Sequence, residues 1–221
     1  NSKAVAEKYS RHLTASKIHV VYQSVDGSLV SNSQVKTTPG LFRCVLAGRL
    51  HEGKGQEEAI RAIAELVRAG APLELVLAGR GWGGYPDYLQ RVTRELGVEK
   101  NVVFTGGVRD SFPYIQTASV VLVCSRSEAF GRVVVEAMWA GKPVIGARSG
   151  GLPELIEEGK IGFLYTPGDY RELAGKIKTL FDNPSQMEQM GRFGKKLAEE
   201  RFSRRHYGEE IIALLNTVRQ A

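Results

Sequence analysis

The sequence predicts an α/β fold built on a doubly wound parallel sheet. Strand-like and helix-like segments alternate through most of the 221 residues. The strand-like segments, such as Leu73–Ala78 and Val120–Cys124, are almost continuously apolar, as expected when helices cover both faces of a sheet. The chain is 43% hydrophobic, and no apolar run approaches the ~18 residues that cross a bilayer.

The expected strands are short apolar runs that follow one another at regular intervals. They are Phe42–Ala47, Leu73–Ala78, Val102–Phe104, Val120–Cys124, Val144–Gly146 and Phe163–Tyr165, with a further short apolar run at Ile18–Tyr22.

The expected helices show helical periodicity or helix start and stop signals. In the second of them, Ala59, Ile60 and Ile63 share one face, and Gly141 followed by Pro143 ends a later one. The helices are Ser2–His12, Gln56–Arg68, Pro86–Leu96, Ser111–Thr117, Arg132–Ala140 and Leu152–Glu157, followed from Asp169 onward by two or three more that are separated at Asn183-Pro184 and Ser203. Gln23–Gly40 is rich in Ser, Thr, Gln and Asn and is expected to be a loop or linker.

Charge and cysteine content bear on the binding partners and on the cellular compartment. The net charge of +6 is spread along the chain, with no RNP-like segment and no basic run interleaved with aromatic residues, so we expect no nucleic-acid partner. Cys44 and Cys124 lie inside apolar runs and predict buried free thiols, a reducing compartment and therefore a cytoplasmic location. The chain opens with Asn1 on a helix-like stretch, which suggests a start inside a longer polypeptide.

Two glycine-rich loops resemble nucleotide-binding motifs without completing them. Gly48 to Gly55 is close to a triphosphatase phosphate loop, but Gly55 stands where a Ser or Thr would hold magnesium, and no later strand ends in an acid. Arg49 and Lys54 still suit an anion. Gly79 to Gly84 matches G-x-G-x-x-G, but Thr105 or Gly106 occupies the position of the ribose-binding acid, so a tight, close-packed turn is favoured.

The segment from Ser125 to Glu136 concentrates the polar chemistry. Glu128 falls on a loop, Glu136 falls a turn and a half into a helix, and Gly131 permits the turn between them. The first amides of that helix, from about Gly131 to Val134, are free to bind a diphosphate. Glu136 could then accept hydrogen bonds from a ribose and Glu128 from a sugar.

Six blocks of the sequence, in order, resemble glycosyltransferase family 4, whose members are retaining enzymes of the GT-B fold. The blocks are Val20 to Asp26, Gly48-Arg49 with Lys54-Gly55, Val102 to Val108, Ser125 with Glu128 to Met138, Ala140 to Ile145, and Gly150 to Glu154. The resemblance implies the C-terminal, Rossmann-like half of a GT-B enzyme that binds a nucleotide diphosphate sugar. UDP is the expected nucleotide because it is the most common in such enzymes, with a GDP-mannose-type donor as the alternative.

The resemblance also implies roles for individual positions. Arg49 and Lys54, beside Gly48, would neutralise the diphosphate and stabilise the departing nucleotide. Glu128 would act with them on the donor sugar, Glu136 would bind ribose, and no divalent metal or other cofactor is expected. The complete set of implied donor-binding residues is Gly48, Arg49, Lys54, Val108, Arg109, Glu128, Ala129, Phe130, Gly131, Arg132, Val133 and Glu136, with Val108 and Arg109 beside the base.

Simpler explanations exist for each of these residues. Arg49 could be an ordinary surface residue, and Lys54 an exposed lysine at a helix start. Glu128 could cap the following helix, and Glu136 could pair with Arg132 four residues earlier. A non-catalytic nucleotide-binding module, a sugar-nucleotide epimerase and a P-loop triphosphatase are the competing functions.

The implied organisation places residues 1–16 at the tail of an acceptor-binding half that precedes this chain. Residues 17–200 form the donor-binding domain, and residues 201–221 a helix that crosses back, with Ile211, Ile212, Leu215 and Val218 exposed as an apolar stripe. The fragment alone is expected to bind donor without transferring sugar. A full-length enzyme could associate peripherally with the cytoplasmic face of a membrane.

Overall fold

The computed structural model describes residues 1–14, 17–25, 35–37 and 39–220, and its centre is a six-stranded parallel sheet. The strands run in the order β3-β2-β1-β4-β5-β6. Their bounds are β1 Phe42–Ala47, β2 Leu73–Ala78, β3 Val102–Phe104, β4 Val120–Val123, β5 Val144–Ala147 and β6 Gly162–Tyr165. Each predicted strand from Phe42 onward is therefore confirmed within one residue.

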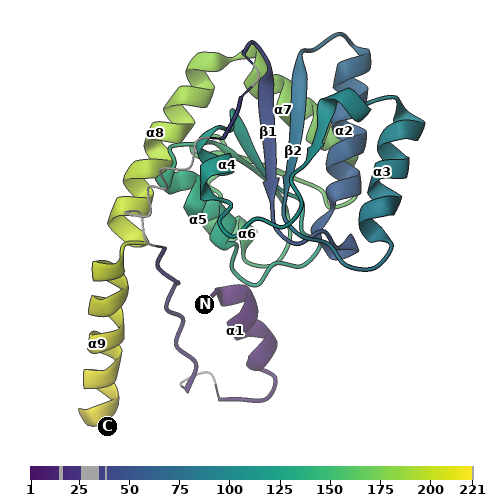
Figure 1. Ribbon diagram of the computed structural model, residues 1–221. Helices are drawn as coiled ribbons and strands as arrows, with labels where there is room; N and C mark the ends of the chain where they lie inside the picture. Colours follow the sequence, from purple (N-terminus) through teal and green to yellow (C-terminus); the bar gives the residue numbers. More distant parts are fainter. Residues whose placement is uncertain (15–16, 26–34, 38, 221) are drawn as a thin grey trace.

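Helices connect the strands and cover both faces of the sheet, as predicted. Their bounds are α1 Lys3–Tyr9, α2 Gln56–Arg68, α3 Tyr85–Leu96, α4 Phe112–Gln116, α5 Arg132–Trp139, α6 Leu152–Leu155, α7 Tyr170–Asp182, α8 Pro184–Arg201 and α9 Arg204–Gln220, with short 3-10 turns η2 Glu52–Lys54 and η3 Glu99–Asn101. Helices α2, α3 and α7 pack together on one face, and α4, α5 and α8 on the other (Figure 1). Between the two layers the strands β1, β2 and β4 are almost wholly buried.

The short apolar run Ile18–Tyr22 does not join the sheet. It has no regular secondary structure, because Tyr22 instead packs its ring against Phe130 and Phe202. Most of the expected linker Gln23–Gly40, including Asp26 of the junction block, lies outside the described residues, and its described parts form neither helix nor strand.

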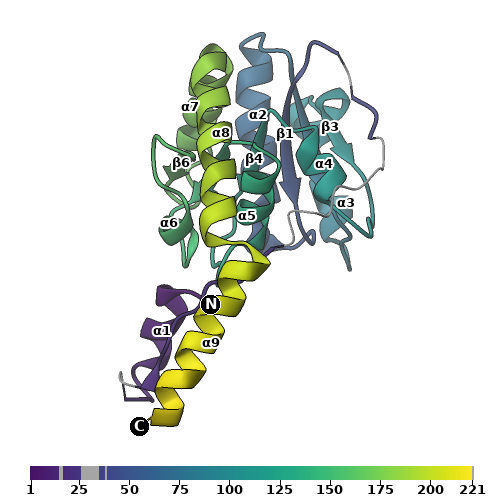
Figure 2. The same cartoon turned by 90° about the vertical axis from the view of Figure 1, so that its left-hand side faces the viewer.

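Two helices lie outside the layered domain. Helices α1 and α9 both extend beyond the edge of the sheet at which the strands end, and the two views show the same arrangement (Figures 1 and 2). Ile212 and Leu215 of α9 are 60% and 58% exposed, which confirms this part of the predicted apolar stripe. Ile211 is half-buried, and the side chain of Val218 lies outside the described residues. No helix among the described residues is both long and apolar enough to cross a bilayer.

Candidate functional site

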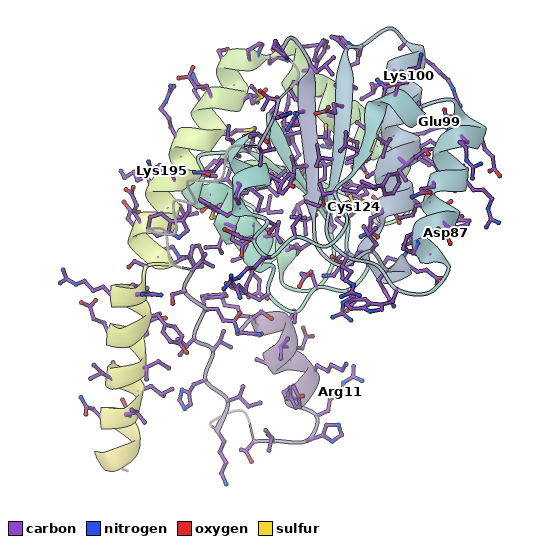
Figure 3. All side chains as sticks on the ribbon, viewed as in Figure 1. Arg11, Asp87, Glu99, Lys100, Cys124 and Lys195 are labelled. Atoms are coloured by element: carbon purple, nitrogen blue, oxygen red, sulfur yellow. The ribbon has the colours of Figure 1, made fainter. Side chains whose placement is uncertain are left out.

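The centre of the sheet is where the chain reverses its direction of winding. Strands β1 and β4 are neighbours, and successive strands are added outward from them on both sides. The loops that follow them, 48–55 and 124–131, therefore meet at the carboxyl edge, the usual ligand position in such sheets. Figure 3 shows Cys124, the residue after β4, inside the molecule near this edge. A pocket of about 920 Å³, here called the central pocket, lies between the two loops.

Lys54 and Glu128 form an ion pair in the wall of the central pocket. Lys54 Nζ lies 2.8 Å from Glu128 Oε2, although the two residues are 74 positions apart in sequence. Ser125 Oγ donates to the same carboxylate oxygen at 3.1 Å and accepts from Lys54 Nζ at 3.3 Å. Both charged side chains remain accessible, at 38% and 18% exposure. A buried serine thus fixes a partly solvated cation beside a partly solvated acid.

Close backbone packing brings the two loops together. Gly55 adopts a left-handed conformation with φ +68°, and a Cβ at this position would lie 2.3 Å from the carbonyl oxygen of Cys124. The amide of Arg126 also donates to the carbonyl of Gly53 at 2.9 Å. Gly55, which stands where the triphosphatase motif has Ser or Thr, is therefore required by the close approach of Cys124, the residue after β4. His51 holds the turn by accepting at Nδ1 from the amide of Gly53.

The loop that carries Glu128 is supported from the other side by the Gly150-Gly151 pair. The amide of Gly151 donates to the carbonyl of Glu128 at 2.8 Å, and a Cβ on Gly150 would lie 2.0 Å from the same oxygen. Ser149 Oγ donates to the carbonyl of Ser125 at 2.5 Å. The two glycines therefore allow the close backbone contact that holds the Glu128 loop in place.

Helix α5 begins at the pocket, as predicted. Its N-cap is Gly131 with φ +101° and no side-chain cap, so the alternative that Glu128 caps this helix is wrong. The first amides of α5, those of Arg132 and Val133, have no partner within the helix and lie in residues that line the pocket.

Glu136 lies further along α5 and forms the predicted pair with Arg132, at 3.3 Å. Burial raises the pKa of Glu136, and the nearby Asp110 adds to the rise while Arg132 opposes it. Glu136 does not line the central pocket, and neither does Val108 or Arg109, which lie on the loop between β3 and α4.

The remaining predicted residues come together in one place. The lining of the central pocket includes Gly48, Arg49, Lys54, Glu128, Ala129, Phe130, Gly131, Arg132 and Val133. Arg49 is exposed and its guanidinium lies 5.8 Å from the ring centroid of Trp82. The Phe130 side chain is buried against Tyr22 and Phe202, so this residue offers the pocket its backbone.

The second glycine-rich loop is a close-packed turn. A Cβ on Gly79 would lie 2.0 Å from the carbonyl oxygen of Gly48, and Gly81 pairs with Leu50 as an extension of the sheet. This glycine pattern therefore serves to let the β2 loop approach the β1 loop.

Seven further residues outside the predicted donor-binding set line the central pocket: Asn1, Gln23, Ala47, His51, Gly53, Arg126 and Ser127. Asn1 and Gln23 come from segments that precede the sheet domain, and Gln23 lies within the Val20 to Asp26 block of the resemblance, to which no donor-binding role was assigned. Ser125 begins the segment in which the sequence concentrates its polar chemistry, but it was given no role there; in the structure its hydroxyl contacts both charges.

Both cysteines are free and buried, as predicted, and burial raises the pKa of Cys124 to about 12. Within the described part of the chain, no group of three or more His, Cys, Asp or Glu residues is arranged to hold a metal ion.

With this geometry in place, comparison with known proteins identifies the family. A family model described as "Glycosyl transferases group 1" matches residues 34–197. The chain belongs to this family. It is 33% identical over 186 residues to a GDP-mannose-dependent alpha-(1-6)-phosphatidylinositol monomannoside mannosyltransferase of Mycolicibacterium smegmatis, covering 80% of this chain and 48% of the relative. It is also 34% identical over 170 residues to the putative glycosyltransferase EpsD of Bacillus subtilis, covering 77% and 44%.

Solved structures of known proteins share this fold. HepE of Anabaena, in a crystal structure with UDP, is 30% identical, with a TM-score of 0.88 over 98% of this chain and 62% of that one. Sucrose-phosphate synthase of Thermosynechococcus elongatus, at 22% identity and a TM-score of 0.85, shows the shared fold alone. The chain spans about half the length of the curated relatives that it matches.

Proposed function

We propose that this chain is the donor-binding half of a retaining glycosyltransferase and that its central pocket binds a UDP sugar. The observation that carries the proposal is the Lys54–Glu128–Ser125 cluster, which places a cation and an acid beside the free amides of α5. The UDP bound to the Anabaena protein supports this nucleotide.

The proposed roles follow from charge and position. Lys54 and Arg49 neutralise the diphosphate, and with the N-terminus of α5 they stabilise the charge that develops on the departing nucleotide. In other transferases a divalent metal neutralises the diphosphate. Here these cations and the helix N-terminus supply that positive charge, so no metal is required. Arg49 can turn toward the diphosphate because, among the residues that the structure describes, only a cation–π contact with the exposed Trp82 holds its side chain.

The acids have separate roles. Glu128, freed from Lys54 when phosphate takes over that cation, accepts hydrogen bonds from the donor sugar, which also meets the backbone of Ala129, Phe130 and Gly131. Glu136 accepts from the ribose hydroxyls. Val108 and Arg109 contact the base, which extends beyond the central pocket.

The remaining parts of the reaction belong to the rest of the protein. The acceptor is a saccharide or a lipid-linked molecule held by a second half, so this chain alone binds donor without transferring sugar. A GDP-mannose-type donor is the second candidate, favoured by the GDP-mannose dependence of the Mycolicibacterium smegmatis relative.

Titration calorimetry with UDP, GDP, ADP and UTP, each with and without magnesium, tests the proposal. We expect metal-independent binding of UDP that Lys54→Ala or Arg49→Ala weakens about tenfold or more, because each loses a charge-assisted contact. Lys100→Ala is the matched control, since Lys100 is an exposed residue of η3, before β3, and lies away from Cys124 (Figure 3).

The other outcomes separate the competing functions. Preference for GDP would select the second donor. Binding that requires magnesium, or that occurs only with UTP, would instead indicate a triphosphatase and contradict the assignment.

A further inference from the structure

A second cavity lies on the opposite side of the η2 turn from the central pocket. This cavity, here called the lateral pocket, has a volume of about 710 Å³ and lies among the first turns of α2, α3 and α7. None of the predicted donor-binding residues lines it. Arg126 borders both pockets, and within η2 Glu52 faces the lateral pocket while Lys54 faces the central one.

Aromatic side chains form much of its wall. The rings of Tyr85 and Tyr88, at the start of α3, are stacked with centroids 5.8 Å apart, and Tyr170 comes from the start of α7. Tyr88 donates its hydroxyl to Glu57 at 2.8 Å, whereas the hydroxyls of Tyr85 and Tyr170 make no hydrogen bond within the described part of the chain. Two half-buried phenols therefore remain available to a ligand.

Glu58 supplies a buried acceptor. The residue is only 6% exposed, and its Oε2 accepts from the Tyr165 hydroxyl at 2.9 Å and from the Gly168 amide at 3.1 Å. Its Oε1 accepts no hydrogen bond from any described residue and is covered by Arg126, whose Nε lies 3.5 Å away. A buried carboxylate oxygen without a hydrogen bond is costly. Because the Arg126 side chain is 65% exposed, it can shift and open this oxygen to a ligand.

The charges around the lateral pocket determine what it can accept. Glu52, Glu57 and Glu58 oppose an anion such as phosphate, while Arg61 and Arg126 oppose a polyamine. Glu57 is already bonded to Arg61 and Tyr88. Glu58 is paired through Oε1 with Arg126, whose exposed guanidinium has to shift before a ligand can reach that oxygen. A ligand would therefore meet the Glu52 carboxylate, this ion pair and two phenols. Donors and acceptors on aromatic walls suit a neutral ligand whose hydroxyls both donate and accept.

We propose that the lateral pocket is a saccharide-binding site, separate from the donor pocket, that holds one sugar unit against Tyr85 and Tyr170. Hydroxyls of the sugar donate to Glu58 Oε1 and to Glu52, and accept from Arg126. Because Arg126 also borders the central pocket, the bound sugar lies next to the proposed donor site, where a segment of an oligosaccharide chain could rest.

Nuclear magnetic resonance of the ¹⁵N-labelled chain tests this site directly. The probes are methyl α-D-glucopyranoside, methyl α-D-galactopyranoside and methyl α-D-mannopyranoside, with maltose to distinguish a chain segment from a single sugar. We expect at least one of the three glycosides to shift the amides of Gly84, Tyr85 and Gly168 saturably, whether or not UDP is present. Maltose that binds more tightly than the glucoside would assign the site to an oligosaccharide, and equal binding would assign it to a single unit; both support the proposal.

Two variants separate binding from structure. Glu58→Gln can keep an oxygen for Tyr165 and Gly168 while presenting an amide donor in place of Oε1, and Glu52→Gln changes an exposed residue. Each should weaken glycoside binding, about tenfold for Glu58→Gln. Glu65→Gln, on the exposed side of α2 and outside the pocket, is the matched control and should bind like the unchanged protein.

Three results would overturn the proposal: no glycoside shifts these amides, both variants bind like the unchanged protein, or sodium phosphate or spermidine binds there more tightly than any glycoside. The same samples titrated with UDP report on the central pocket through Lys54 and Gly131. Shifts with UDP but not with glycosides would contradict only this inference, whereas shifts with glycosides but not with UDP would contradict only the proposed donor site.

Discussion

Lys54 and Glu128 are paired in the structure, yet the proposed function gives them different ligands. UDP contains the diphosphate that Lys54 is proposed to bind, but it lacks the donor sugar that Glu128 is proposed to bind. Glu128→Gln should therefore leave UDP affinity unchanged or slightly higher, because Lys54 loses a competing partner, and should weaken UDP-glucose about tenfold. Lys54→Met should weaken both ligands. Calorimetry with the two ligands measures the difference, and a loss of UDP affinity in Glu128→Gln as large as that in Lys54→Met would refute the division of roles.

Gly55 is the residue that separates this loop from a triphosphatase loop. Gly55→Ser would restore the motif but place its Cβ 2.3 Å from the Cys124 carbonyl oxygen at φ +68°. Gly97→Ser is a matched control, since Gly97 has φ +70° and open space around its Cβ position. We expect Gly97→Ser to lower the free energy of unfolding by about 1–2 kcal/mol from backbone strain alone, and Gly55→Ser to lower it by clearly more.

Urea denaturation of the two glycine variants measures this difference. Equal losses of stability would mean that the β1 and β4 loops can separate at little cost. Magnesium-dependent triphosphate binding by a folded Gly55→Ser variant would mean that the loop is a degraded triphosphatase motif.

At the scale of elements, the sequence was sufficient to predict the strands and helices of the sheet domain. Apolar runs such as β2 and β4 can be buried only in a sheet covered on both faces, and Gly131 and Gly141 mark where α5 begins and ends. The run Ile18–Tyr22 is equally apolar but is not a strand, because its burial comes from ring contacts of Tyr22 with residues more than 100 positions away. Periodicity carries no information about such contacts.

The same limit applies to the candidate site. Parallel strands bring their carboxyl ends together, so a shared pocket for Arg49, Lys54 and Glu128 followed from the strand assignment alone. That Lys54 and Glu128 bond each other directly depends on the exact approach of two loops, which Gly55 and Gly150 set by contact. Glu58 was not predicted as a site residue for another reason. An acid in the first turn of a helix normally faces water, and Glu58 is buried here because β6 and the segment before α7 pack against α2.

One carboxylate of the sheet domain binds the start of helix α1. Glu154, at the start of α6, accepts from the amides of Lys3 and Ala4 at 2.8 Å each and from the Tyr22 hydroxyl at 2.9 Å. Burial opposes the charged form of Glu154, but these three hydrogen bonds outweigh it and lower its pKa. Burial and the same bond raise the pKa of Tyr22 to about 12.

This attachment should weaken in acid. A lowered pKa in the folded state means that Glu154 contributes stability above the ordinary glutamate value of about 4.3 and loses it as pH falls through the folded value. Glu154→Gln should therefore be less stable than the unchanged protein at pH 7, with the difference shrinking below about pH 4. Urea midpoints across this range measure it. Glu157→Gln, which loses only an exposed pair with Lys160, is the control, and an acid response of Glu154→Gln equal to that of the unchanged protein would contradict this account.

At the scale of the whole molecule, the most unusual surface is that of α9. This helix leaves the sheet domain and extends past the same edge of the sheet as α1, from which it stands apart in Figure 1 (Figures 1 and 2). It carries large exposed apolar side chains at Tyr207, Ile212 and Leu215, and α1 with the turn after it adds Tyr9 and Leu13. Because the relatives are about twice as long as this chain, the proposed acceptor-binding half is the natural cover for this surface.

Replacing Ile212 and Leu215 together by Gln tests that assignment in two proteins. In this chain both side chains face solvent, so the free energy of unfolding should change by less than about 0.5 kcal/mol and UDP binding should be unaffected. In a protein extended to the length of its relatives, the same pair should lower stability by about 1–3 kcal/mol, because two buried apolar side chains would become polar. Ala213→Gln, an exposed position on the same helix, is the control that adds an amide without removing a large apolar group. A double variant that is neutral in both proteins would show that α9 is not a surface between the two halves, and the two helices outside the sheet domain would then need another partner.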